Sequence, residues 1–94
     1  MKLHEELFTD IDLNSLFTFL VVYRERGVTK AAERLNVTQP AVSNTLAKLR
    51  LYFHDPLFIR HSRGLTPTPK ATKIMLKLGP ALMEIQKVLQ TTAQ

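Results

Sequence analysis

Residues 28–50, VTKAAERLNVTQPAVSNTLAKLR, contain the start signals of two helices separated by a short turn. Thr29 is the expected N-cap of a short first helix, because a side-chain oxygen can accept from the free N–H groups of the first turn. Thr38 is the next expected N-cap. Pro40 follows in the first turn, where its missing N–H breaks no intrahelical hydrogen bond. The stretch therefore predicts a helix-turn-helix whose second helix spans about residues 39–52.

The second helix has one apolar side. Val42, Leu46 and Leu49 recur at spacings of four and three, which places them on one face toward a core. The opposite face contains polar, small and basic residues and no acidic residue. Its members are Gln39, Pro40, Ser43, Asn44, Ala47 and Lys48.

A longer helix is predicted before this motif, over residues 13–26, with Asp12 as its N-cap and Gly27 as its stop signal. Apolar residues cover two of its faces. The stripe expected to face the core contains Leu13, Leu16, Phe17 and Leu20. Phe19, Val22 and Tyr23 are expected to lie off that stripe and to need cover from another element or chain. The predicted core residues are Phe17, Leu20, Val42, Leu46, Leu49 and Phe58.

A hairpin is predicted after the second helix. Residues 57–60 are expected to form a short strand, residues 61–64 a tight turn, and residues 65–68 the returning strand. Pro67 limits the second strand to an edge position, because it cannot donate to a ladder. A hairpin at this point in the chain would be the wing of a winged helix-turn-helix.

A final helix is predicted from Thr68 and Pro69 to about Thr92. It is too long to be covered by a domain of about 65 residues, so its apolar stripe is expected to pair with a second copy. Pro80 cannot donate to the carbonyl of Leu76, which predicts a kink near Gly79 and Pro80.

Charge is distributed unevenly along the 94 residues. Residues 1–23 contain one Lys and four acidic residues, whereas residues 24–77 contain eleven basic and three acidic residues. A basic middle favours a polyanionic partner, although a merely solvated surface can also carry such charge. The chain has no cysteine, and no secretion signal or membrane span is evident, which favours a cytoplasmic and nucleoid-associated location.

No catalytic or metal site is predicted. His4, His54 and His61 are far apart in the sequence and have no metal-ligand spacing. No nucleophile and base pair is evident either, so we expect neither an enzyme nor a cofactor.

Two segments carry a resemblance to a known family. VTKAAERLNVTQPAVSNTLAKLR, followed by FHDPLFIRHSRGLTPTPKA at residues 53–71, resembles the N-terminal region of LysR-type transcriptional regulators, and in particular their LeuO-like branch. The resemblance covers about residues 10–72. It implies a mainly α winged helix-turn-helix of three helices and a two-stranded wing, followed by a linker helix that dimerises. The expected division is an N-terminal extension over 1–11, the winged domain over 12–67 and the linker helix over 68–94.

The resemblance also implies partners. A homodimer, or a tetramer in the full-length protein, would bind an interrupted palindrome in promoter DNA. Full-length relatives carry a C-terminal domain for a small-molecule effector. This chain is therefore expected to be a fragment of a longer regulator, or else a natural short protein.

Site residues follow from the motif and the resemblance together. Residues expected to contact bases are Gln39, Pro40, Ser43 and Asn44. The alternative is that these are ordinary solvent-facing residues without a role in binding. Residues expected at the DNA backbone or minor groove are Thr29, Lys30, Thr38, Lys48, Arg50, Arg60 and Arg63. Residues expected in the dimer interface are Phe19, Val22, Tyr23, Ile74, Leu78, Leu82, Ile85 and Leu89.

The predicted function is sequence-specific binding of double-stranded DNA in transcription control. The helix over about 39–52 would enter the major groove, and the wing over 57–68 would contact the backbone or the minor groove. A protein-interaction module is the alternative, because winged helices also bind proteins. The acid-free exposed side of the helix over 39–52 favours DNA, since a protein-docking face more often carries aromatic anchors.

Overall fold

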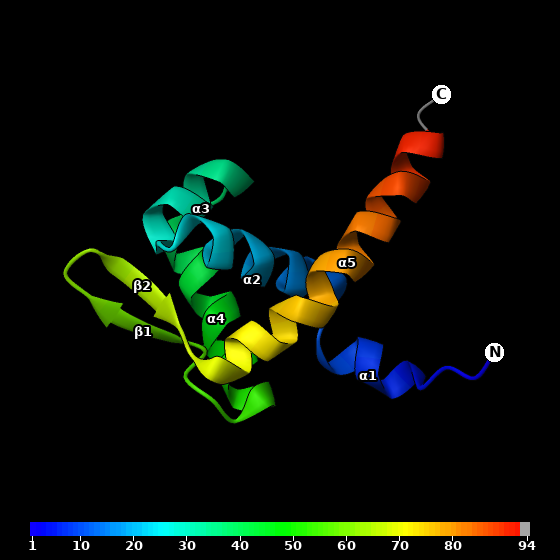
Figure 1. Cartoon of the computed structure of the whole chain (residues 1–94), viewed down its shortest axis with the longest axis horizontal. Coiled ribbons are helices and arrows are strands. Elements are labelled where there is room, and N and C mark those ends of the chain that lie inside the picture. Colours follow the sequence, from blue (N-terminus) through cyan, green and yellow to red (C-terminus); the bar gives the residue numbers. More distant parts are fainter. Residues whose placement is uncertain (93–94) are drawn as a thin grey trace.

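The computed structural model describes residues 1–92, which form five helices and one two-stranded sheet. Figure 1 shows the wing at one end of the molecule and the long last helix leaving toward the other. The elements are α1 (Glu5–Asp10), α2 (Leu13–Glu25), α3 (Val28–Leu35), α4 (Gln39–Phe53), β1 (Phe58–His61), β2 (Gly64–Pro67) and α5 (Pro69–Thr92). This order confirms the predicted class of a mainly α winged helix-turn-helix followed by a long helix.

Side-chain caps begin three of the helices. Asp12 Oδ1 accepts from Ser15 N at 2.7 Å at the start of α2. Thr38 Oγ1 accepts from Ala41 N at 3.2 Å at the start of α4, and Thr68 Oγ1 does the same for Ala71 N at 3.1 Å. Each cap satisfies an N–H group that has no partner inside its helix.

The start of α3 differs from the prediction. Gly27 is its N-cap residue, and no side chain caps the helix. Thr29 therefore lies inside the first turn, and its predicted role as a cap is wrong. Arg26 ends α2 in the left-handed conformation with a φ of 57°, and extended Gly27 leads directly into α3, so the helix begins at Val28, one residue before Thr29.

The core lies on a different face of α2 from the predicted one, and the two faces share Leu20. Phe19 and Val22 are both 0% exposed, whereas Phe17 is 46% exposed and Leu13 lies equally open. Phe19 packs against Phe58 of the wing, with ring centroids 5.4 Å apart. Leu20, Val42, Leu46, Leu49 and Phe58 are buried as predicted, but Phe17 is not a core residue. The assignment of Phe19 and Val22 to a dimer interface is also wrong, because their side chains are enclosed within one copy.

β1 and β2 form an antiparallel hairpin with the register Phe58↔Pro67 to His61↔Gly64. Ser62 and Arg63 make the turn. The strands lie within one residue of their predicted limits, and the ladder ends at Pro67. The wing is therefore a short projection whose tip carries Arg63.

A hydrogen-bonded junction connects the wing to α5. Asp55 Oδ2 accepts from Thr68 Oγ1 at 2.7 Å and from Leu57 N at 2.8 Å. These bonds, from Thr68 first and Leu57 second, with the charge of Lys70, hold the pKa of Asp55 below its usual value. Leu57 is fully buried with a φ of 64°, and its carbonyl accepts from Thr68 N at 2.9 Å. The junction thus fixes where α5 begins.

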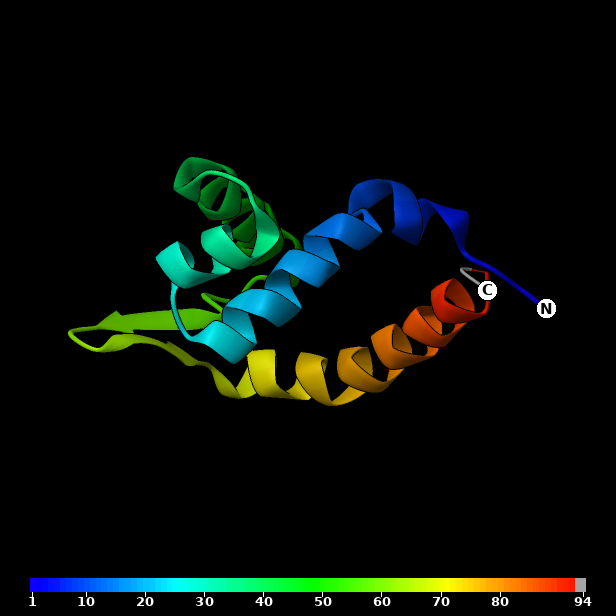
Figure 2. The ribbon, with the colours of Figure 1, turned by 90° about the horizontal axis from the view of Figure 1, so that it is seen from above.

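α5 is one helix through Pro80, and Figure 2 shows that it is curved along its length. It runs back along α2, where Tyr23 Oη and Thr72 Oγ1 lie 3.3 Å apart. Ala71 is buried at this contact, and Ile74, Leu78 and Leu82 are half-buried against the core. The linker helix was predicted over 68–94, and its residues 93 and 94 lie outside the described residues.

The N-terminal extension contains a short helix that was not predicted. α1 has no buried residue, and the chain enters the core only at Ile11. Within residues 1–92, no helix is both long and apolar enough to cross a membrane.

Candidate nucleic-acid interface

A cleft of about 630 Å³ lies between the start of α3, the first half of α4 and the wing. Gln39 and Ser43 of α4 line one wall, four residues apart and therefore on one face of the helix. Both side chains are exposed. The cleft thus presents amide and hydroxyl groups, which can donate and accept, from the N-terminal half of the second helix of the motif.

The wing is attached to the floor of this cleft. Leu65 N donates to Arg26 O at 2.9 Å, which fixes the returning strand to the end of α2. Gly64 has a φ of +127°, and a Cβ added there would lie 2.5 Å from Arg26 O. Only glycine permits both this backbone conformation and this close approach. The position of the wing relative to the end of α2 is therefore set by backbone contacts.

Positive charge dominates the cleft. Arg26, Lys30, Arg60 and Arg63 line it together with a single acidic residue, Glu25. The Glu25 carboxylate lies 3.7 Å from Arg34 Nε, so part of its charge is compensated from outside. A surface of this kind attracts an anionic backbone.

The structure brings together six of the predicted DNA-contact residues. The cleft is lined by Thr29, Lys30, Gln39, Ser43, Arg60 and Arg63. Thr38, Pro40, Asn44 and Lys48 are exposed on α4 or at its start but do not line the cleft. Arg50 is half-buried, and its Nε donates to Pro56 O at 3.0 Å, so part of its guanidinium serves the loop before the wing.

The prediction missed Arg26, His61, Ser62 and Gly64. The wing turn was recognised, so His61 and Ser62 could have been included from their position beside Arg63. Arg26 could not, because it enters the cleft through a contact with residue 65, which is distant in the sequence. Its Nε donates to Tyr23 O at 2.6 Å, and its guanidinium lies 4.9 Å from the centroid of the Tyr23 ring.

A second, apolar groove lies between α2 and α5 on another side of the molecule. Its volume is about 430 Å³, and we call it the α2–α5 groove. The apolar residues that line it are Leu13, Phe17, Leu20, Leu82, Met83, Ile85 and Leu89. Three predicted interface residues, Leu82, Ile85 and Leu89, therefore share a surface with Leu13 and Phe17, which were expected in the core.

No group of three potential metal ligands occurs among residues 1–92. A compact helical domain, an exposed polar helix and a basic wing instead define a winged helix-turn-helix that binds nucleic acid.

This chain belongs to the lysR family of bacterial regulatory helix-turn-helix proteins. The family model described as "Bacterial regulatory helix-turn-helix protein, lysR family" matches residues 13–72. The domain is thus a DNA-binding domain of transcription regulation. The narrower resemblance to the LeuO-like branch stays a prediction.

Relatives and solved structures agree with this assignment. HTH-type transcriptional regulator YidZ of Citrobacter koseri is 56% identical over 61 residues, which are 65% of this chain and 19% of that protein. Probable transcriptional regulator PA0477 from Pseudomonas aeruginosa has a TM-score of 0.83 and 33% identity, over 90% of this chain and 28% of that one. The BenM DNA-binding domain, solved with catB site 1 DNA, has a TM-score of 0.79 and 26% identity, over 88% and 93% of the two chains.

Proposed function

We propose that this chain recognises specific sites in double-stranded promoter DNA as a homodimer. The observation that carries the proposal is the basic cleft in which Gln39 and Ser43 of α4 face the wing. The first half of α4 would enter the major groove, whose width of about 12 Å admits a helix. The wing would then lie along the backbone or the minor groove.

The roles of the individual side chains follow from their chemistry. Gln39 can present a donor and an acceptor to adenine, while Ser43 can bond to a base or a phosphate. Pro40 and Asn44, exposed on the same half of α4, would complete the contact with bases. The side chains proposed for the backbone are Thr29, Lys30, Thr38, Lys48, Arg50, Arg60 and Arg63, with Arg26 added from the cleft.

The α2–α5 groove supports a homodimer. Phe17, Ile85 and Leu89 remain substantially exposed there, although burying a side chain of this size gains about 1.5 to 3 kcal/mol. A second copy related by a two-fold axis would cover the same groove twice. The two recognition helices would then meet successive major grooves about 34 Å apart, which favours an interrupted palindrome.

The effector is proposed to bind outside this chain. The chain spans 19% of the length of the YidZ relatives. A small-molecule site and any tetramer contacts of a full-length regulator would lie in the remaining part.

A competition mobility-shift assay tests the reading role of α4. Gln39→Ala and Ser43→Ala should each lose about 1 to 3 kcal/mol of preference for the operator over random DNA, because each removes a base contact. Gln90→Ala, the same change on an exposed residue of α5, is the matched control. Wild-type preference in both α4 variants would show that α4 does not read the sequence.

Sedimentation at micromolar concentration tests the dimer. Ile85→Lys places a charge in the α2–α5 groove and should give a folded monomer that binds a single half-site weakly. Leu51→Lys, at an exposed leucine of α4, should stay dimeric. A monomeric wild-type chain, or a dimeric Ile85→Lys variant, would contradict the proposed interface.

A further inference from the structure

α1 is a helix with acidic and large apolar side chains, none of which is buried within residues 1–92. Glu5, Glu6 and Asp10 supply three negative charges, and α1 contains no basic residue. Leu7 and Phe8 are large apolar side chains on the same short helix, and Phe8 is 55% exposed. A surface that is both acidic and apolar suits a partner that is both basic and apolar.

The chain itself contains such a surface, at the start of α5. A hollow of about 790 Å³ is lined by Lys70, Lys73 and Lys77, which recur at spacings of three and four along one side of the helix. Ile74 and Leu76 form its apolar part, and Leu76 is 72% exposed. We call this surface the lysine hollow.

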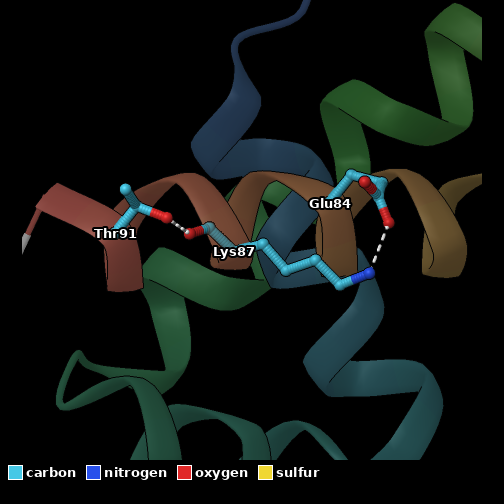
Figure 3. Close-up of polar contacts among 3 residues, drawn as sticks. All are labelled: Glu84, Lys87 and Thr91. Carbon is cyan, nitrogen blue, oxygen red and sulfur yellow. Dashed lines mark hydrogen bonds and ion pairs between the residues drawn. The ribbon is translucent and has the colours of Figure 1, made fainter.

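Two features make the lysine hollow a better binding surface for an acidic segment than the second half of α5. The second half of α5 has its charges already paired, because Lys87 Nζ lies 3.0 Å from Glu84 Oε2 (Figure 3). Thr91 Oγ1 donates to Lys87 O on the same side of the helix, so this side is occupied by its own polar contacts. At the hollow, the one carboxylate, Asp55, already accepts two hydrogen bonds.

α1 cannot reach the lysine hollow of its own chain. It joins the first residues of α2, whereas Thr72, within the hollow's stretch of α5, contacts Tyr23 near the last residues of α2. The helix rises about 15 Å between Leu13 and Tyr23, at about 1.5 Å per residue. Figure 2 shows α1 and the start of α5 at opposite ends of α2.

We propose that α1 of one copy binds the lysine hollow of a second copy, with its carboxylates facing the lysines and Leu7 and Phe8 against Leu76. This inference rests on the proposed homodimer and adds a second contact to it. α1 directly precedes Leu13, which lines the α2–α5 groove together with the second half of α5. An antiparallel pairing of two α5 helices in this groove would bring the first half of the partner's α5, with its lysines, toward α1. A two-fold axis would make this contact twice.

Charge reversal tests the contact. Glu6→Lys and Lys73→Glu should each raise the dimer dissociation constant about tenfold at low salt, because attraction becomes repulsion in two copies of the contact. The chain that carries both substitutions should recover wild-type association, since opposite charges face one another again. Neither position is buried, so both variants should fold. Lys48→Glu, the same reversal on exposed α4, is the control and should leave association unchanged.

Cysteine cross-linking tests proximity directly, in a chain that contains no cysteine of its own. A mixture of Phe8→Cys chains and Leu76→Cys chains should form a disulfide-linked heterodimer under mild oxidation. Phe8→Cys mixed with Ile59→Cys, at an exposed residue of the wing, should not.

The outcomes separate this inference from the homodimer itself. A wild-type dimer that tolerates both reversals and forms no cross-link through Phe8→Cys would overturn the α1 contact alone. A monomeric wild-type chain would overturn the contact and the homodimer together. If Lys73→Glu leaves dimerisation intact but weakens half-site binding, the lysine hollow contacts DNA, and the α1 contact is wrong.

Discussion

Two helices of this chain begin with the same chemistry in different surroundings. Thr38 and Thr68 both cap a helix through Oγ1, and a proline follows each within the first turn. Thr38 is exposed at the start of α4, whereas Thr68 is only 9% exposed at the start of α5. The two threonines differ in whether the hydroxyl proton has an acceptor within the domain.

The proton of Thr68 goes to Asp55 Oδ2 at 2.7 Å, which joins α5 to the loop before the wing. The Thr38 hydroxyl has no acceptor within the described part of the chain. It is therefore free to donate to a phosphate at the start of the helix, where the helix dipole also favours an anion. One cap thus serves the architecture, and the other is available to a ligand.

The largest expected effect is on stability at the buried cap. Thr68→Val should lower the free energy of unfolding by about 2 to 3 kcal/mol, because it removes a cap and also a hydrogen bond to a carboxylate. Thr38→Val should cost about 1 kcal/mol, since only the cap is lost. Urea denaturation of both variants measures the contrast, and equal losses would contradict it.

DNA affinity should show the opposite order. Thr38→Val should weaken DNA binding about tenfold, because a hydrogen bond to a charged oxygen is lost. Thr38→Ser keeps both the cap and the donor and should bind as the wild type does. Thr68→Val, assayed at a temperature where it is folded, should also keep its affinity. Equal DNA affinities of the Thr38→Val and Thr38→Ser variants would contradict the proposed phosphate contact.

A smaller effect is expected at the wing. Arg63→Ala should make the slope of log affinity against log salt concentration shallower by about 0.9, the value for one phosphate contact. Arg50→Ala should change the slope less, since Arg50 already donates to Pro56 O. An unaltered slope in Arg63→Ala would place the tip of the wing away from DNA.

The smallest effect concerns pH. The pKa of Asp55 is lowered in the folded chain, mainly by its bond from Thr68 and then by that from Leu57. Its contribution to stability is therefore present above the unfolded pKa of about 3.9 and is lost as the pH falls through the folded pKa. Asp55→Asn should reduce the loss of stability between about pH 5 and pH 2. Asp10→Asn makes the same change of charge on α1, and identical acid profiles for the two variants would argue against this role.

Local signals predicted most of the fold, because caps and prolines act within one turn of the helix they start. The caps Thr38 and Thr68 were recognised on this basis, whereas the same signal at Thr29 was wrong. The face of α2 was not recognised, since the helix is apolar on two sides. One side packs against Phe58 through Phe19, and the other lines the α2–α5 groove through Phe17. Periodicity detects both stripes but contains no information about which one meets the core.

The cleft was predicted only in part. Gln39 and Ser43 followed from their positions in the first half of the second helix, which a helix-turn-helix directs toward DNA, and Arg63 followed from its place in the wing turn. Arg26 was missed because its place depends on the bond between Arg26 O and Leu65 N, which joins segments far apart in the chain. The location of such a residue is a property of the tertiary structure.

The close approach of Gly64 to Arg26 O also bears on how the wing can vary among regulators. The end of the ladder beside the turn is held at Gly64, a backbone position that accepts no side chain, while Ser62 and Arg63 extend beyond it. Insertions or substitutions at the tip can therefore change what the wing contacts without shifting the backbone contact that joins it to the end of α2. Diversification of the tip is decoupled from the stability of the domain, and a library randomised at residues 62 and 63 with Gly64 retained should consist mainly of folded members.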